Sequence, residues 1–165
     1  MCYWGGVCNK LIHSNLYRNI RFSHNVNYCE DVLYLAAMCY QLEFRLSRVD
    51  KPLYNYDKSI ENSITSGKFT KDKFKAYRTF QAELQKYCRS LTFQQLTNSI
   101  GDLALKTFLY DALSPTEFYR EFKGERKYLK AMHAPRNLKL LIVASSYGLY
   151  MPCQLFFKLY SWIRR

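Results

Sequence analysis

Two adjacent acidic residues, Glu30 and Asp31, are the side chains of this sequence best suited to acid and base chemistry. One carboxylate can take a proton from a hydroxyl group while its neighbour binds or orients the reacting groups. The pair stands out because the chain is strongly basic, with 25 Lys and Arg against 13 Asp and Glu and a formal net charge of +12. The pair is therefore the first candidate for a catalytic dyad.

The same pair also suits a purely structural role at the start of a helix. Carboxylates in a first helical turn are stabilised by the helix dipole. Apolar residues follow the pair at the spacing of a largely buried helix. They are Val32, Leu33, Leu35, Ala36, Met38 and Cys39. Only the surrounding residues can show whether Glu30 and Asp31 form a helix cap or a catalytic dyad.

Short extended segments are predicted on both sides of this helix. Asn19–Phe22 precedes it, and Glu43–Val49 and Pro52–Tyr56 follow it with the alternation or the aromatic content that strands favour. We therefore expect an α+β fold that is mostly α-helical and has a few short strands.

The chain after about residue 65 is predicted to be almost entirely helical. A stripe of apolar residues at three- and four-residue intervals indicates a helix over about 20 residues from Thr70, and a second helix is expected over Phe93–Leu113. A third helix begins at the capping box Ser114–Glu117, which has Pro in its first helical position. Gly124 is expected to interrupt it.

The C-terminal stretch Leu140–Phe157 carries no charge over 18 residues, which is near the lower limit for a membrane span. Gly148 and Pro152 indicate a break between two shorter helices, and basic residues at both ends give no orientation signal. We therefore favour two amphipathic helices that lie at a membrane surface or pack on the core. The Lys and Arg residues that flank them would contact lipid phosphates.

The six cysteines show neither a Cys-x-x-Cys motif nor a cluster with His at zinc-ligand spacing. The first residues lack the pattern of a secretory leader, so free thiols in a reducing cytosol are expected. This chain is therefore predicted to bind no metal or other cofactor.

Five short motifs, in their order along the chain, resemble the second half of the catalytic domain of bacterial family 2 glycosyltransferases. The motifs are Val7–Leu11, Ile20–Phe22, Tyr28–Leu33, Pro52–Tyr56 and Asn62–Ile64. Enzymes of this family have a GT-A type fold and build capsular polysaccharide, exopolysaccharide and lipopolysaccharide chains. The resemblance covers residues 7–64, and the remainder is only loosely similar to the family's variable helical tail.

The resemblance implies roles for several residues. Asp31 would be the base that deprotonates the acceptor hydroxyl during transfer with inversion, and Glu30 would hold that hydroxyl or orient Asp31. The partners would be a nucleotide-sugar donor and a growing polysaccharide or lipid-linked glycan, on the inner face of the cytoplasmic membrane. Four further residues would line or brace the site, namely Asn9, Lys10, Tyr54 and Tyr56.

The sequence lacks the elements with which this family holds its donor. Family members bind the nucleoside diphosphate with an N-terminal Rossmann-like unit, and bind Mg or Mn with an Asp-x-Asp motif, and neither occurs in the 165 residues. Without the cation, the departing diphosphate loses a large electrostatic stabilisation. We therefore expect a fragment or a split enzyme that is inactive without a separately encoded N-terminal half.

The chain is expected to consist of three parts. Residues 1–64 would be the acceptor-side part of a GT-A domain, 65–135 a helical subdomain, and 136–165 a basic, aromatic amphipathic tail. The alternative is a non-catalytic basic helical module that binds a membrane surface or nucleic acid. The basic residues are spread over all segments and no nucleic-acid-binding motif occurs, so an anionic membrane surface is the favoured partner.

Overall fold

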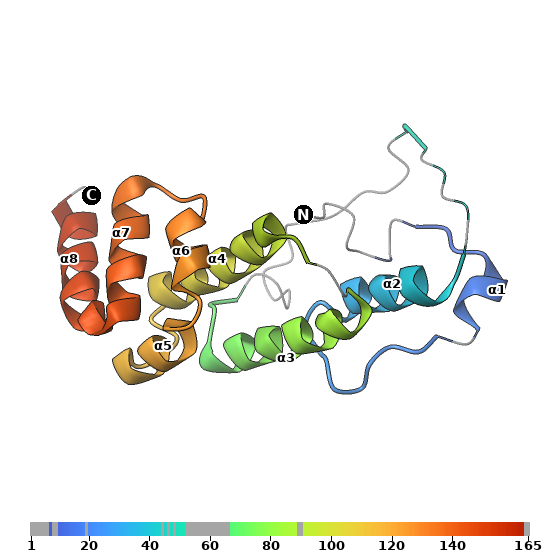
Figure 1. The fold of residues 1–165 in the computed structure, drawn as a ribbon, viewed down its shortest axis with the longest axis horizontal. Helices are drawn as coiled ribbons and strands as arrows, with labels where there is room; N and C mark the ends of the chain where they lie inside the picture. Colours follow the sequence, from blue (N-terminus) through green and yellow to red (C-terminus); the bar gives the residue numbers. More distant parts are fainter. Residues whose placement is uncertain are drawn as a thin grey trace. The chain divides into compact units, whose positions relative to one another are not determined.

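In the computed structural model, helices follow one another along the chain (Figure 1). The structure describes residues 7, 10–18, 20–43, 45, 47, 49–51, 67–88 and 91–163. The elements are α1 (Ser14–Tyr17), α2 (Glu30–Gln41), α3 (Lys71–Tyr87), α4 (Phe93–Leu109), α5 (Pro115–Phe122), α6 (Arg126–Ala131), α7 (Arg136–Ala144), the π-helical turn η1 (Ser145–Leu149) and α8 (Tyr150–Ile163). The chain divides into two compact units. The first unit is Met1–Lys68 with Lys75–Ser90, and the second unit is Phe69–Phe74 with Leu91–Arg165.

The described residues are all-α and contain no β-strand, so the prediction of an α+β fold with strands of a GT-A remnant is wrong. In the segment Glu43–Val49 every second residue is described, and none belongs to a strand. Alternating polarity shows only which side chains could share a face, whereas a strand also needs a partner for its backbone hydrogen bonds. Ile20 instead closes a turn, because its N–H donates to the carbonyl of Tyr17 at 3.3 Å. The segment Pro52–Tyr56 lies outside the described residues.

Buried side chains of α2 hold the first unit together by packing on α3 and on the chain that precedes α2. The two clusters consist of Ile20, Tyr34, Ala37 and Met38, and of Val26, Leu33 and Phe80. Phe22 extends the first cluster, because its ring stacks on that of Tyr34 with centroids 4.5 Å apart. Cys39 was expected on the buried face of α2, but it is exposed. Tyr34 is buried instead, because the helical period places it on the same face as Leu33, Ala37 and Met38.

An aromatic core holds the second unit together. Phe118 of α5 lies at its centre, with its ring centroid 4.7 Å from that of Phe122 and 5.0 Å from that of Tyr150 in α8. The largest fully buried apolar side chains come from all the helices from α4 to α8. They are Leu103, Phe108, Phe118, Phe122, Leu129, Ile142 and Tyr150. Burial of each contributes about 1.5–3 kcal/mol, so this core is the main source of stability in the second unit.

The predicted start of α5 is confirmed. The Ser114 hydroxyl accepts a hydrogen bond from the N–H of Glu117 at 3.4 Å, and the Glu117 carboxylate accepts one from the N–H of Ser114 at 3.0 Å. These bonds satisfy two of the backbone N–H groups that a helix start leaves without partners. The interruption at Gly124 is also confirmed, since α5 ends at Phe122 and α6 begins at Arg126.

The stretch Arg136–Trp162 is long and apolar enough, by length and composition, for a membrane-spanning helix. Gly148 divides it, because its φ of 97° lies in the left-handed region that glycine adopts without steric cost. The helices α7 and α8 therefore fold back on each other and lie side by side as a hairpin (Figure 1). The predicted break between two shorter helices is confirmed. At 1.5 Å per residue, the 14 residues of α8 extend over about 21 Å, less than the roughly 30 Å of a hydrocarbon core.

We expect Gly148→Ala to lower the free energy of unfolding of the protein by about 1–2 kcal/mol, because a Cβ atom disfavours the left-handed backbone at this turn. Urea denaturation followed by circular dichroism measures this loss. Gly124→Ala is the matched control: neither glycine has an atom within 4 Å of an added Cβ, but only Gly148 has a positive φ. Equal losses in the two variants would contradict the role of the left-handed turn.

Candidate functional site

Glu30 and Asp31 form the first turn of α2, and both side chains are half-buried. The Oδ1 atom of Asp31 accepts a hydrogen bond from the backbone N–H of Val32 at 2.8 Å. The preceding residue, Cys29, provides no side-chain cap, so the carboxylate of Asp31 satisfies one of the N–H groups at this helix start. The arrangement fits both interpretations of the pair, the helix start and the catalytic dyad.

The backbone just before the acidic pair is strained. Cys29 has φ 57° and ψ 29°, a left-handed conformation that residues other than glycine rarely adopt. Such a conformation costs of order 1–3 kcal/mol and persists only where the surroundings enforce it, which is commonest at functional sites. The strain at Cys29 is consistent with a functional origin of the pair, and the one other described non-glycine residue with a positive φ is Asp111 in the second unit.

Lys10 is half-buried and lies in a segment that packs against α2. Its backbone N–H donates to the carbonyl of Val7 at 3.1 Å, and Val7, Ile12 and Leu16 contact the cluster around Tyr34. The structure thus brings this segment to the helix that carries the acidic pair. Three other residues predicted for the site lie outside the described residues, namely Asn9, Tyr54 and Tyr56.

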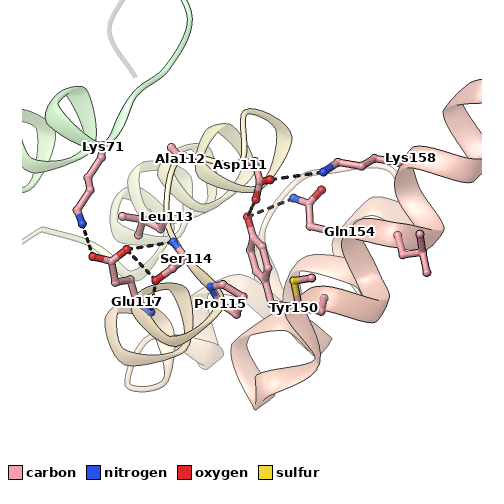
Figure 2. Close-up of a pocket in the computed structure, with 12 residues that line it drawn as sticks. Lys71, Asp111, Ala112, Leu113, Ser114, Pro115, Glu117, Tyr150, Gln154 and Lys158 are labelled. Atoms are coloured by element: carbon pink, nitrogen blue, oxygen red, sulfur yellow. Dashed lines mark hydrogen bonds and ion pairs between the residues drawn. The ribbon is translucent and has the colours of Figure 1, made fainter.

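A pocket of about 440 Å³ in the second unit, lined by both polar and apolar side chains, was not predicted from the sequence (Figure 2). It lies between α8 and the segment that joins α4 to α5. The carboxylate of Asp111 accepts hydrogen bonds from the Tyr150 hydroxyl at 2.8 Å and from the Lys158 ammonium at 3.4 Å. The side-chain amide of Gln154 donates to the Tyr150 oxygen at 3.2 Å. Asp111 thus anchors α8 to the end of α4.

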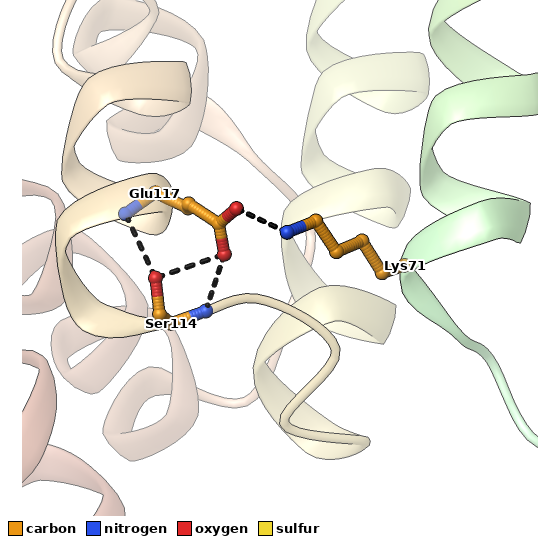
Figure 3. Close-up of polar contacts among 3 residues, drawn as sticks. All are labelled: Lys71, Ser114 and Glu117. Carbon is orange, nitrogen blue, oxygen red and sulfur yellow. Dashed lines mark hydrogen bonds and ion pairs between the residues drawn. The ribbon is translucent and has the colours of Figure 1, made fainter.

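The second carboxylate of this pocket, Glu117, is fixed by the capping box of α5 and by an ion pair with Lys71 (Figure 3). The hydrogen bond from Lys71, with those from Ser114, lowers the pKa of Glu117 from 4.5 to about 2. Burial raises the pKa of the Tyr150 hydroxyl, and the Asp111 carboxylate raises it further. The hydroxyl therefore stays protonated, and each lysine of the pocket is paired with a carboxylate. This balance of charge suits a structural network better than an acid–base site.

Cationic and aromatic side chains meet where α6 contacts the turn of the α7–α8 hairpin. The Arg126 guanidinium lies 3.9 Å from the ring centroid of Tyr147 and donates to the carbonyl of Ser146 at 2.7 and 3.1 Å. Lys130 lies 5.8 Å from the same ring centroid. Arg126 thus satisfies a carbonyl group of η1 and places positive charge beside the turn.

The described residues contain no group of three or more His, Cys, Asp or Glu side chains that could hold a metal ion. A divalent cation such as Mg²⁺ or Ca²⁺ takes several oxygen ligands at once, and carboxylates usually supply some of them. The described carboxylates therefore do not fit the cation that the resemblance implies for the donor.

No protein-family model matches the chain, and neither a curated protein nor a solved structure is significantly similar to it. The resemblance to family 2 glycosyltransferases, which depends on five short motifs, stays a prediction. Any function must be argued from the residues of the chain.

We expect the protein to lose stability in acid when the Glu117 carboxyl becomes protonated. Because its pKa is lower in the folded protein than in the unfolded chain, its contribution to stability is present above pH 4.5 and is lost as the pH falls towards about 2. Thermal unfolding followed by circular dichroism over this range measures the loss.

Glu117→Gln and Lys71→Met each remove the ion pair, and both variants should lose less stability over this range than the wild-type protein. An unchanged pH dependence in both would show that other carboxyl groups are responsible.

Proposed function

We propose that the first unit provides the acceptor side of a site that transfers a sugar from a nucleotide donor to a glycan, with Asp31 as the base. The observation that carries this proposal is the placement of a half-buried Asp31 in the first turn of α2, two residues after the strained residue Cys29. The order of motifs over residues 7–64 supports it. The proposal depends on these residues and not on a GT-A fold, since the described part is all-α.

In the proposed reaction, the acceptor hydroxyl oxygen attacks the anomeric carbon of the donor sugar and its proton passes to Asp31. The bond between the sugar and the phosphate breaks, and the nucleoside diphosphate leaves with the bonding electrons. The Val32 N–H holds Oδ1 of Asp31, so Oδ2 is the atom that would take the proton. Glu30 would bind the same hydroxyl or keep Asp31 in position.

The donor would be held mainly by groups other than the described carboxylates, which do not fit a divalent cation. Since an unstabilised diphosphate is a poor leaving group, Asp31 alone should not give turnover. A separately supplied donor-binding half would complete the site. The described residues should therefore recognise the acceptor glycan and not the nucleotide.

The alternative is that the acidic pair only starts a helix, within a non-catalytic interaction module. The helix α3 offers a comparison for this possibility, because Asp72 also lies in a first helical turn. A carboxylate at either position interacts with the helix dipole, and this interaction is worth about 0.3–1 kcal/mol. A purely structural role therefore predicts similar effects for the loss of either charge.

We expect the purified protein to bind oligosaccharide acceptors without releasing nucleoside diphosphate from nucleotide sugars. Asp31→Asn should weaken this binding about tenfold, because the glycan hydroxyl would then donate to a neutral amide instead of a charged carboxylate. Saturation-transfer NMR against a panel of bacterial oligosaccharides measures the affinity.

Asp72→Asn is the matched control, and it should lower stability by a similar amount and leave glycan binding unchanged. The proposal fails if the wild-type protein binds no glycan, or if the two variants bind glycan equally well.

A further inference from the structure

The outer face of α8 is apolar along the length of the helix. Its large apolar side chains recur at three- and four-residue intervals, while Tyr150, Cys153 and Gln154 on the opposite face are buried. The exposed fractions range from 38% for Tyr160 to 77% for Trp162. The exposed residues are Met151, Leu155, Phe156, Leu159, Tyr160 and Trp162. A continuous apolar surface of this kind is uncommon on a soluble monomer and marks a contact with a partner.

The segment that carries this face has only positive charges, and the acidic residue that contacts α8, Asp111 at the end of α4, is paired with Lys158. Residues 126–165 contain eight Lys and Arg and no Asp or Glu. Arg126 and Lys130 lie at the turn of the hairpin, beside Tyr147. At the other end, Arg136 and Lys139 begin α7, which the antiparallel hairpin places beside the end of α8 (Figure 1). The apolar face therefore has cations at both ends.

An anionic lipid surface fits this combination better than a second copy of the chain. Apolar side chains of an amphipathic helix enter the boundary between headgroups and acyl chains, while Lys and Arg contact the phosphates. Tyr and Trp favour this depth, which suits Tyr160 and Trp162 near the end of α8. A second copy would instead bring the basic segments of two chains together, and like charges repel.

The hairpin also explains why the contact would lie on the surface of the bilayer. The helix α8 alone is too short to cross the hydrocarbon core, and Gly148 turns α7 back beside it. Lys158 lies on α8 with its ammonium exposed beside Asp111, so its aliphatic stem can lie along the lipid while its charge stays in water.

We propose that the α7–α8 hairpin docks on anionic membranes, with α8 lying flat in the headgroup region and its six exposed apolar side chains turned towards the acyl chains. This docking surface is separate from the acidic pair in the first unit. It does not depend on the proposed transfer of sugars.

Flotation with lipid vesicles tests the proposal on the full chain. The protein should bind vesicles that contain about one third phosphatidylglycerol at least tenfold more tightly than pure phosphatidylcholine vesicles. About 0.5 M NaCl should release most of it, because salt screens the charges. In a Trp4→Phe background, the fluorescence of Trp162 should shift to shorter wavelength on binding, which reports entry into the lipid.

Leu155→Gln should weaken binding to the anionic vesicles about tenfold, because it places a polar group in the middle of the apolar face. Leu11→Gln is the matched control, since Leu11 is fully exposed in the first unit and should not affect binding. Circular dichroism of both variants checks that the helices are retained.

Three outcomes would overturn the proposal. Equal binding to neutral and anionic vesicles would show that lipid charge does not determine binding. Unchanged binding of Leu155→Gln would show that the apolar face of α8 does not contact the lipid. If the protein without lipid is a dimer that Leu155→Gln converts to a monomer, a second copy covers the face instead.

Discussion

The left-handed backbone of Gly148 is the constraint on which the arrangement of the C-terminal part depends. At this turn the apolar stretch of residues 136–162 divides into α7 and α8. With it, Tyr150 at the start of α8 returns to the core, where its ring packs on Phe118 and on Phe108. The same turn leaves the far side of α8 exposed. One backbone angle therefore decides which apolar residues become core and which become surface.

The carboxylates of the two candidate sites differ in their partners. Asp111 and Glu117 each contact a lysine and at least one hydroxyl group, so their charges are balanced and they stabilise the second unit. Asp31 accepts a hydrogen bond from a backbone N–H and lies two residues after the strained Cys29. Asp111 in the pocket also has a positive φ, of 52°, so the balance of charge and not the backbone conformation separates the two sites. For this reason we prefer the acidic pair to the pocket as the candidate for chemistry.

The two proposals fit together as a working hypothesis for the whole chain. The proposed base, Asp31, lies in one unit, and the surface proposed to bind anionic lipid lies in the other. An acceptor attached to a lipid would be presented at such a surface. Binding to a membrane would then raise the local concentration of the acceptor without any new contact to the sugar.

The amino-acid sequence alone was sufficient for features that depend on neighbours in the chain. The capping box at Ser114 and Glu117, the interruption at Gly124 and the break before α8 all follow from local hydrogen bonding and backbone freedom, and the structure agrees with each. The position of the acidic pair in a first helical turn was predicted in the same way.

Only the tertiary structure decided features that join distant residues. The predicted strands are absent from the described residues because alternation at 43–49 supplies no partner strand. The pocket could not be foreseen, because Asp111 and Tyr150 are 39 residues apart and Lys71 and Glu117 are 46 apart. Such contacts depend on how the helices pack in three dimensions, and the local pattern of residues does not specify that packing.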